Sequence, residues 1–174
     1  VYSRENISRT TEDQISYVLE LIDKYRLIYV EDPLHEEAFS DFTRLSSQNN
    51  NCLIVGDDLF VTNTSILQKG IDQKAGNSVI LKVNQAGALG DAMEFAALCN
   101  KNNYAIIASH RSGDTIDPHL AHISIGSGAV MMKSGVVGGE RVSKLNELIR
   151  IDETNFINNG LSLPIARINK YVNW

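Results

Sequence analysis

Five short runs of aliphatic residues recur along the chain, and a polar or charged side chain follows each of them. The polar residues are Glu31, Asp57, Lys82, His110 and Lys133, spaced 26, 25, 28 and 23 residues apart. Each interval has the length of one strand, one helix and two short loops. This spacing predicts βα units of a (β/α) barrel whose polar side chains line the carboxyl edge of the sheet. The predicted strands are 27–30, 52–56, 79–81, 104–109 and 129–132.

The strand at 79–81 is the most informative of the five. Three consecutive large aliphatic residues indicate that both of its faces are covered, as in a parallel sheet. Lys82 follows them directly, and a lysine in such surroundings is costly unless its ammonium has a partner or a function. Because five strands cannot close an eight-stranded barrel, we predict an α/β fold: an open, partial (β/α) barrel of about five parallel strands with flanking helices.

Helical periodicity fills the intervals between the strands. A capping box with Thr11 as N-cap and Gln14 reaching back predicts a helix before the first strand. Gly87 is expected to open the helix after Lys82. A helix after Gly139 is expected to bury Val142, Leu145 and Ile149, and residues 151–174 look turn-rich.

Composition and charge narrow the class of protein. The chain has 174 residues, of which 43% are hydrophobic and 21% charged, which is typical of a folded domain. The net charge of −5 and the lack of a Lys/Arg cluster argue against nucleic acid or a membrane surface as partner. Cys52 and Cys99 do not form a CxxC pair and are expected to be buried free thiols. With no apolar span and no signal peptide at the start, we expect a cytoplasmic protein.

The acidic residues at the strand ends have two interpretations each. Glu31 in Glu-Asp-Pro could belong to a solvated proline turn, and Asp57 in Asp-Asp could cap a helix. Together, however, their oxygens suit a hard divalent cation, Mg²⁺ above all. The histidines His119 and His122 have no third ligand nearby and are expected on a solvated helix face.

The basic and polar residues complete a candidate site. Nearby positive charge would favour the neutral amine of Lys82, the form that can act as a general base. His110, Arg111 and Ser112, within Ser-His-Arg-Ser-Gly, suit a phosphate or carboxylate anion. The set suggests removal of a proton next to a carboxylate, with metal ions stabilising the resulting charge.

Four motifs resemble the enolase (phosphopyruvate hydratase) family, in that family's order: Gly-Asp-Asp-Leu-Phe-Val-Thr-Asn, Leu-Lys-Val-Asn-Gln, Ser-His-Arg-Ser-Gly and Lys-Leu-Asn-Glu-Leu-Ile-Arg-Ile. The resemblance runs from about residue 11 to about 153 and covers the second part of the enolase barrel, equivalent to strands four to eight. It implies a barrel portion at 1–153, a tail at 154–174 and Mg²⁺-dependent dehydration of 2-phosphoglycerate to phosphoenolpyruvate.

The resemblance also implies a role for each site residue. Glu31 and Asp57 match two of the three carboxylates that hold Mg²⁺, and Lys82 matches the base that removes the C2 proton. The remaining matches are substrate contacts: His110, Arg111 and Ser112 for substrate and phosphate, and Lys133 for the substrate carboxylate. An intact enzyme of this family is expected to be a dimer or larger homo-oligomer.

Some family features have no match in this stretch, among them the third metal aspartate and the acid that protonates the leaving hydroxyl. The chain by itself is therefore expected to be weakly active or inactive. After Gly113 the sequence departs from the family, and His122 stands where an aspartate is common. Two alternatives stay open: another acid–base enzyme of the enolase superfamily, and a non-catalytic half-barrel that serves as scaffold or assembly partner.

Overall fold

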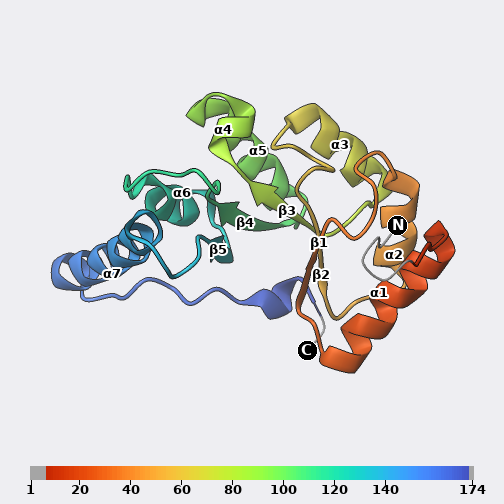
Figure 1. Cartoon of the computed structure of the whole chain (residues 1–174). Helices are drawn as coiled ribbons and strands as arrows, with labels where there is room; N and C mark the ends of the chain where they lie inside the picture. Colours follow the sequence, from red (N-terminus) through yellow and green to blue (C-terminus); the bar gives the residue numbers. More distant parts are fainter. Residues whose placement is uncertain (1–6, 173–174) are drawn as a thin grey trace.

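All five aliphatic runs form parallel strands in the computed structural model, which describes residues 7–172. The sheet order is β1-β2-β3-β4-β5, and each strand pairs in parallel with the next. Helices flank the curled sheet (Figure 1). This confirms the predicted fold of five parallel strands, although the first and the last strand each begin two residues later than predicted. The strands are Tyr29–Glu31, Leu53–Gly56, Ser78–Leu81, Ala105–Ser109 and Met131–Lys133.

The helices alternate with the strands, as the periodicity predicts. In the described part of the chain none of them is both long and apolar enough to cross a membrane. Residues 1–6 of the predicted barrel portion and residues 173–174 of the predicted tail lie outside the described residues. The helices are α1 Thr11–Tyr25, α2 Phe39–Ser47, α3 Thr64–Gln73, α4 Val83–Ala86, α5 Leu89–Lys101, α6 His119–Ser127 and α7 Gly139–Asn159, with a 3₁₀ turn at Ile168–Lys170.

Two predicted helix starts are wrong in detail. The N-cap of α1 is Thr10, not Thr11, because Thr10 Oγ1 accepts a hydrogen bond from the Asp13 backbone N–H at 3.2 Å. The Thr10 backbone N–H donates in turn to the Asp13 carboxylate at 3.1 Å, while Gln14 Nε2 donates to the Pro33 carbonyl instead. Gly87 does not open a helix: it ends the one-turn helix α4 with φ +88°, a conformation that glycine adopts without strain.

The outer face of the sheet carries the main hydrophobic core. Ile54, Val79, Leu81 and Ile106 point towards the helices and pack with their apolar faces. Phe60 lies fully buried in this core, edge-on to Phe39 and Tyr104 at ring-centroid distances of 6.3 and 6.2 Å. Both cysteines are free and buried there, as expected.

The inner face of the sheet carries a second, smaller cluster. The alternate residues Leu53, Val55, Ile80, Ala105 and Ile107 point inwards. From the end of α7 the chain crosses back to the other end of the sheet (Figure 1). There Val172 packs on the inward-facing side chains and is only 3% exposed. The two clusters explain why the central strands are buried on both faces.

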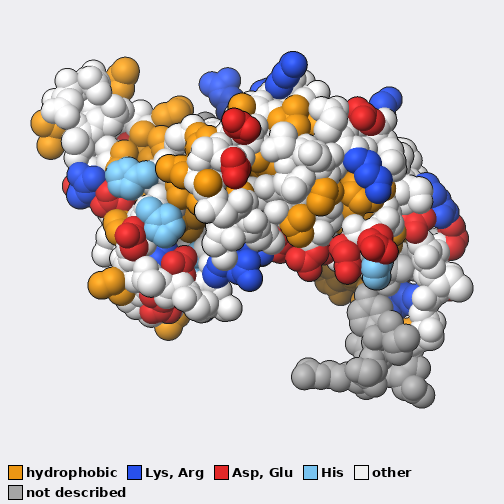
Figure 2. All heavy atoms as spheres, turned by 90° about the horizontal axis from the view of Figure 1, so that it is seen from above, with side chains coloured by type: hydrophobic (Ala, Val, Ile, Leu, Met, Phe, Trp, Pro, Cys, Tyr) orange, Lys and Arg blue, Asp and Glu red, His pale blue; other side chains and the backbone are white. Residues whose placement is uncertain are grey.

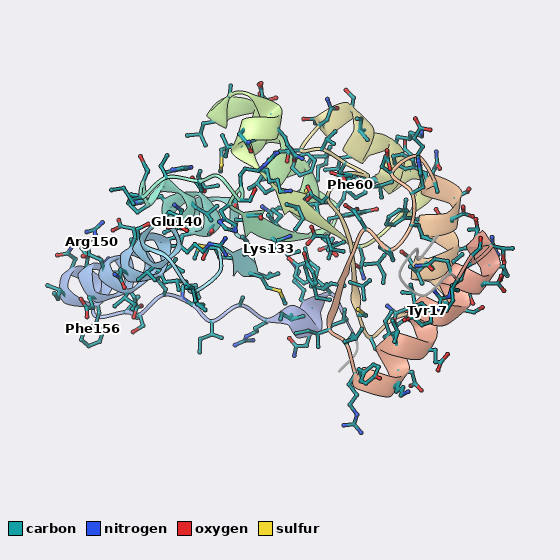
Figure 3. All side chains as sticks on the ribbon, in the orientation of Figure 1. Tyr17, Phe60, Lys133, Glu140, Arg150 and Phe156 are labelled. Carbon is teal, nitrogen blue, oxygen red and sulfur yellow. The ribbon has the colours of Figure 1, made fainter. Side chains whose placement is uncertain are left out.

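Helix α7 differs most from its prediction. It continues through residues 151–159, which were expected to be turn-rich, and ends at Asn159 before Gly160. Ile149 is 57% exposed instead of buried, and the fully buried residue of the helix is Lys144. Phe156 points away from the sheet (Figure 3). The predicted division between barrel portion and tail at 153/154 therefore falls inside one helix, and it stays a prediction.

Charged side chains are spread over the surface shown in Figure 2, where Lys and Arg lie apart from one another and among Asp and Glu.

Two helical glycines offer a matched test of the core. A Cβ at Gly70 in α3 would lie 2.4 Å from Phe60 Cε1, whereas a Cβ at Gly90 in α5 would have no neighbouring atom within 4 Å. We expect Gly70→Ala to lower the free energy of unfolding by about 1–3 kcal/mol through overpacking. Gly90→Ala should raise it by about 0.4–1 kcal/mol. Urea denaturation of the two variants measures both; equal effects would contradict the packing around Phe60.

Candidate functional site

The two edge strands of the sheet are joined by an ion pair between side chains far apart in the sequence. Lys133 Nζ at the end of β5 lies 2.8 and 2.6 Å from the two carboxylate oxygens of Glu31 at the end of β1. In an eight-stranded barrel, strands four positions apart lie on opposite sides. The pair therefore spans the mouth of the partial barrel; Figure 3 labels Lys133.

Glu31 is held as a carboxylate by its neighbours. Burial acts to raise its pKa, but the hydrogen bonds from Lys133 and from the Tyr29 hydroxyl outweigh burial and hold the pKa below its ordinary value. Burial and the hydrogen bond to Glu31 raise the pKa of Tyr29, so Tyr29 remains a donor at neutral pH. Glu31 is thus ionised without being fully exposed to water.

A second pair forms at the neighbouring strand ends. Lys82 Nζ, directly after β3, contacts Asp57 Oδ2, directly after β2. The Lys82 and Asp57 side chains are 13% and 9% exposed, so the pair is largely removed from solvent. Gln85 Nε2 lies 3.4 Å from the other oxygen of Asp57. Asp57 therefore does not act as the solvated helix cap that the sequence left open.

Asp32 organises this edge, a role that the sequence analysis missed. Its two oxygens accept the backbone N–H groups of Asp57 and Asp58 at 3.0 and 2.9 Å. Burial raises the pKa of Asp32, and the two neighbouring aspartates act in the same direction. Its φ of +41° is unusual for a residue with a side chain, and the pattern Glu-Asp-Pro did not reveal that conformation.

Three carboxylates meet at this edge. One oxygen from each of Glu31, Asp32 and Asp57 lies within 4.8 Å of the others, a spacing that could hold a metal ion. The partners of Glu31 and Asp57 are side chains, whereas both oxygens of Asp32 accept backbone N–H groups, which a cation could not replace without moving the backbone. The predicted pair of ligands is therefore brought together.

The turn before α3 holds the backbone of Lys82 through a hydrogen bond. The Lys82 backbone N–H donates to Thr62 Oγ1 at 3.0 Å, and the Thr62 hydroxyl donates to Gln85 Oε1 at 3.0 Å. Val61 and Thr62 have φ values of +43° and +51°, which are strained for β-branched residues. Such strain persists only where the surroundings impose it, and it is frequent at functional sites.

The loop after β4 lies on the other side of the site. The His110 backbone N–H donates to the Lys133 carbonyl at 3.1 Å. Its Nδ1 is buried and has no hydrogen-bond partner in the described part of the chain. Burial and the Arg141 guanidinium hold the pKa of His110 below its ordinary value, so the ring is neutral at pH 7.

Arg111 and Ser112 are exposed, and within residues 7–172 no hydrogen bond or ion pair joins their side chains to the carboxylates or lysines. The structure thus brings Glu31, Asp57, Lys82 and Lys133 together, with His110 beside Lys133, but not Arg111 and Ser112. His119 and His122 lie on a solvated helix face, as predicted, and pair with Asp117 and Glu147.

Comparison with known proteins gives the family. The profile described as enolase, C-terminal TIM barrel domain, matches residues 2–160. The enolase of Methanosphaera stadtmanae is 51% identical over 154 residues, which cover 88% of this chain and 37% of that protein. The enolase of Archaeoglobus fulgidus is 50% identical over 153 residues, covering 88% of this chain and 38% of that protein.

The chain belongs to the enolase C-terminal barrel family. This confirms the resemblance and the partial barrel predicted from the sequence. The chain spans less than two fifths of the length of these enolases, so it corresponds to part of an enolase barrel. Residues 2–160 include every predicted site residue and all of α7.

Thr62 offers a test of how this enolase barrel supports Lys82. Thr62→Val removes the acceptor of a backbone N–H and the partner of Gln85, whereas Thr62→Ser keeps both. We expect Thr62→Val to lower the free energy of unfolding by about 1–3 kcal/mol, the cost of a buried unsatisfied donor. Thr62→Ser should cost clearly less. Urea denaturation checks this, and equal losses in both variants would contradict a role for the hydroxyl.

Proposed function

We propose that the protein containing this chain is an enolase that catalyses the reversible, Mg²⁺-dependent dehydration of 2-phosphoglycerate to phosphoenolpyruvate. The observation that carries the proposal is the meeting of four charged strand ends, Glu31, Asp57, Lys82 and Lys133, in a chain of the enolase family. We also propose that the intact enzyme is a cytoplasmic homo-oligomer, a dimer or larger.

Glu31 and Asp57 would hold the metal. Carboxylate oxygens suit a hard cation, and the close approach of Lys133 to Glu31 and of Lys82 to Asp57 shows that both acids take a positive partner here. Mg²⁺, when bound, stabilises negative charge that develops on the substrate carboxylate. Asp32 would keep Asp57 in place through the backbone N–H of Asp57.

The bases and donors then have distinct roles. Lys82 would be the base that accepts the proton from C2 of the substrate, and Thr62 and Gln85 fix the strand end from which it reaches. Lys133 binds the substrate carboxylate. The neutral ring of His110 contacts the substrate, and Arg111 and Ser112, exposed in the same loop, bind its phosphate.

Lys82→Met in the complete protein tests the role of the base. We expect kcat for 2-phosphoglycerate to fall by about 10²–10⁴-fold, the usual contribution of a general base. Lys101→Met, the same change at an exposed lysine on α5, is the control and should leave kcat unchanged. The assay follows phosphoenolpyruvate by absorbance.

Two results would contradict the proposal: full turnover by Lys82→Met, or no turnover by the unaltered complete protein. The latter would favour a non-catalytic half-barrel or another superfamily activity.

The isolated 174-residue chain should turn over slowly or not at all, because the third metal carboxylate and the acid are expected elsewhere in the complete protein.

Glu31→Gln tests the metal site directly. Replacing the carboxylate by an amide removes a negative oxygen ligand, so the Mg²⁺ dissociation constant should rise by at least about 10–100-fold. Isothermal titration of the complete protein with Mg²⁺ measures it without turnover. Glu94→Gln, at an exposed acid on α5, is the control. Unchanged Mg²⁺ affinity in Glu31→Gln would exclude Glu31 as a ligand.

A further inference from the structure

Lys144 is the one fully buried lysine in the described part of the chain, at 0% exposure on α7. A buried ammonium is costly unless it is paired and hydrogen-bonded. Sequence periodicity placed Val142, Leu145 and Ile149 on the buried face of this helix, yet Lys144 lies deepest. Its burial therefore needs a specific explanation.

The partners of Lys144 lie in the loop that follows β4. Lys144 Nζ donates to the Thr115 carbonyl and lies 3.8 Å from Asp114 Oδ1. The Asp114 side chain is itself only 15% exposed, so the contact is shielded from water. A helix 29 residues further along the chain thus fixes the far end of this loop.

The near end of the same loop is fixed by the sheet. The His110 N–H donates to the carbonyl of Lys133 in β5 at 3.1 Å. Within the loop itself, the Asp114 N–H donates to the Arg111 carbonyl at 3.1 Å and closes a turn. Arg111 and Ser112 lie between these two fixed points with exposed side chains. Their position is therefore set by the backbone of the loop and not by contacts of their own to the carboxylates and lysines.

The charges around His110 make this loop suitable for an anion. Arg141, Lys144 and Lys133 act on His110 as positive charges, and Asp114 acts as the opposing negative charge. Since Lys144 Nζ lies 3.8 Å from Asp114 Oδ1, it offsets the acid that follows the candidate anion contacts in the sequence. Removing the Lys144 charge would leave the Asp114 carboxylate beside them without this cation, held by the Thr115 backbone N–H at 2.8 Å.

We propose that Lys144 is a positioning residue that holds the loop 110–115 in the shape in which Arg111 and Ser112 bind the substrate phosphate. The inference rests on the proposed function. Lys144 acts through Asp114 and Thr115 and does not touch the substrate. A purely structural lysine would instead stabilise the fold as a whole, without a specific effect on the loop or on anion affinity.

The test uses the complete protein with Lys144→Met, which keeps the chain length but removes the charge, and Lys144→Arg, which keeps the charge. Lys101→Met is the control at an exposed site. Hydrogen exchange of the 111–116 amides should become faster in Lys144→Met. The dissociation constant for inorganic phosphate and KM should each rise about tenfold, with a smaller change in kcat. Lys144→Arg should recover part of both losses.

Unchanged loop exchange and phosphate affinity in a folded Lys144→Met protein would overturn the proposal. So would a fall in kcat without a rise in KM. If Lys144→Met does not fold, Asp114→Asn replaces it, because it removes the ion pair with Lys144 and keeps the size of the side chain: faster exchange of the loop amides supports the proposal, and unchanged exchange overturns it. Loop exchange and phosphate binding need no turnover, so failure of the unaltered protein to convert 2-phosphoglycerate would count against the proposed function alone.

Discussion

Parallel pairing of five consecutive βα strands places the carboxyl end of every strand at one edge of the sheet, and the curl of the sheet turns that edge into a ring. The ion pair between Lys133 and Glu31 depends on this geometry, because its partners are 102 residues apart and on opposite edge strands. The Lys82–Asp57 pair needs only the parallel pairing of β2 and β3, whose carboxyl ends are neighbours. Without the curl, Lys133 and Glu31 could not reach each other across the sheet.

Each of the three carboxylates at this edge has a cationic or hydrogen-bonding partner close to it. Glu31 and Asp57 each have a lysine, and Asp32 is satisfied by backbone N–H groups. Each partner removes the cost of keeping a carboxylate out of water. The resulting set of ionised, pre-positioned groups is suited to binding a cation and an anion side by side.

The backbone at this edge is strained while the core beneath it is well packed. Asp32, Val61 and Thr62 all have positive φ, and Thr62 and Asp32 both support the groups on which the proposed chemistry depends. Phe60, which directly precedes Val61 in the sequence, is fully buried and fills the space left by Gly56 and Gly70. Dense packing of this kind can hold the turns in conformations that they would not adopt alone.

The sequence by itself determined the five strands, their parallel order and the meeting of Glu31, Asp57, Lys82 and Lys133, because aliphatic runs followed by polar residues at a βα spacing leave few other arrangements. Local patterns also located most of the helices. Only the tertiary structure decided the roles of Asp32, Thr62 and Lys144, and the packing of Val172 on the inner face. Those roles depend on contacts between residues 20 to 29 positions apart or more, and on positive φ at β-branched residues. Neither feature leaves a periodic signal in the sequence.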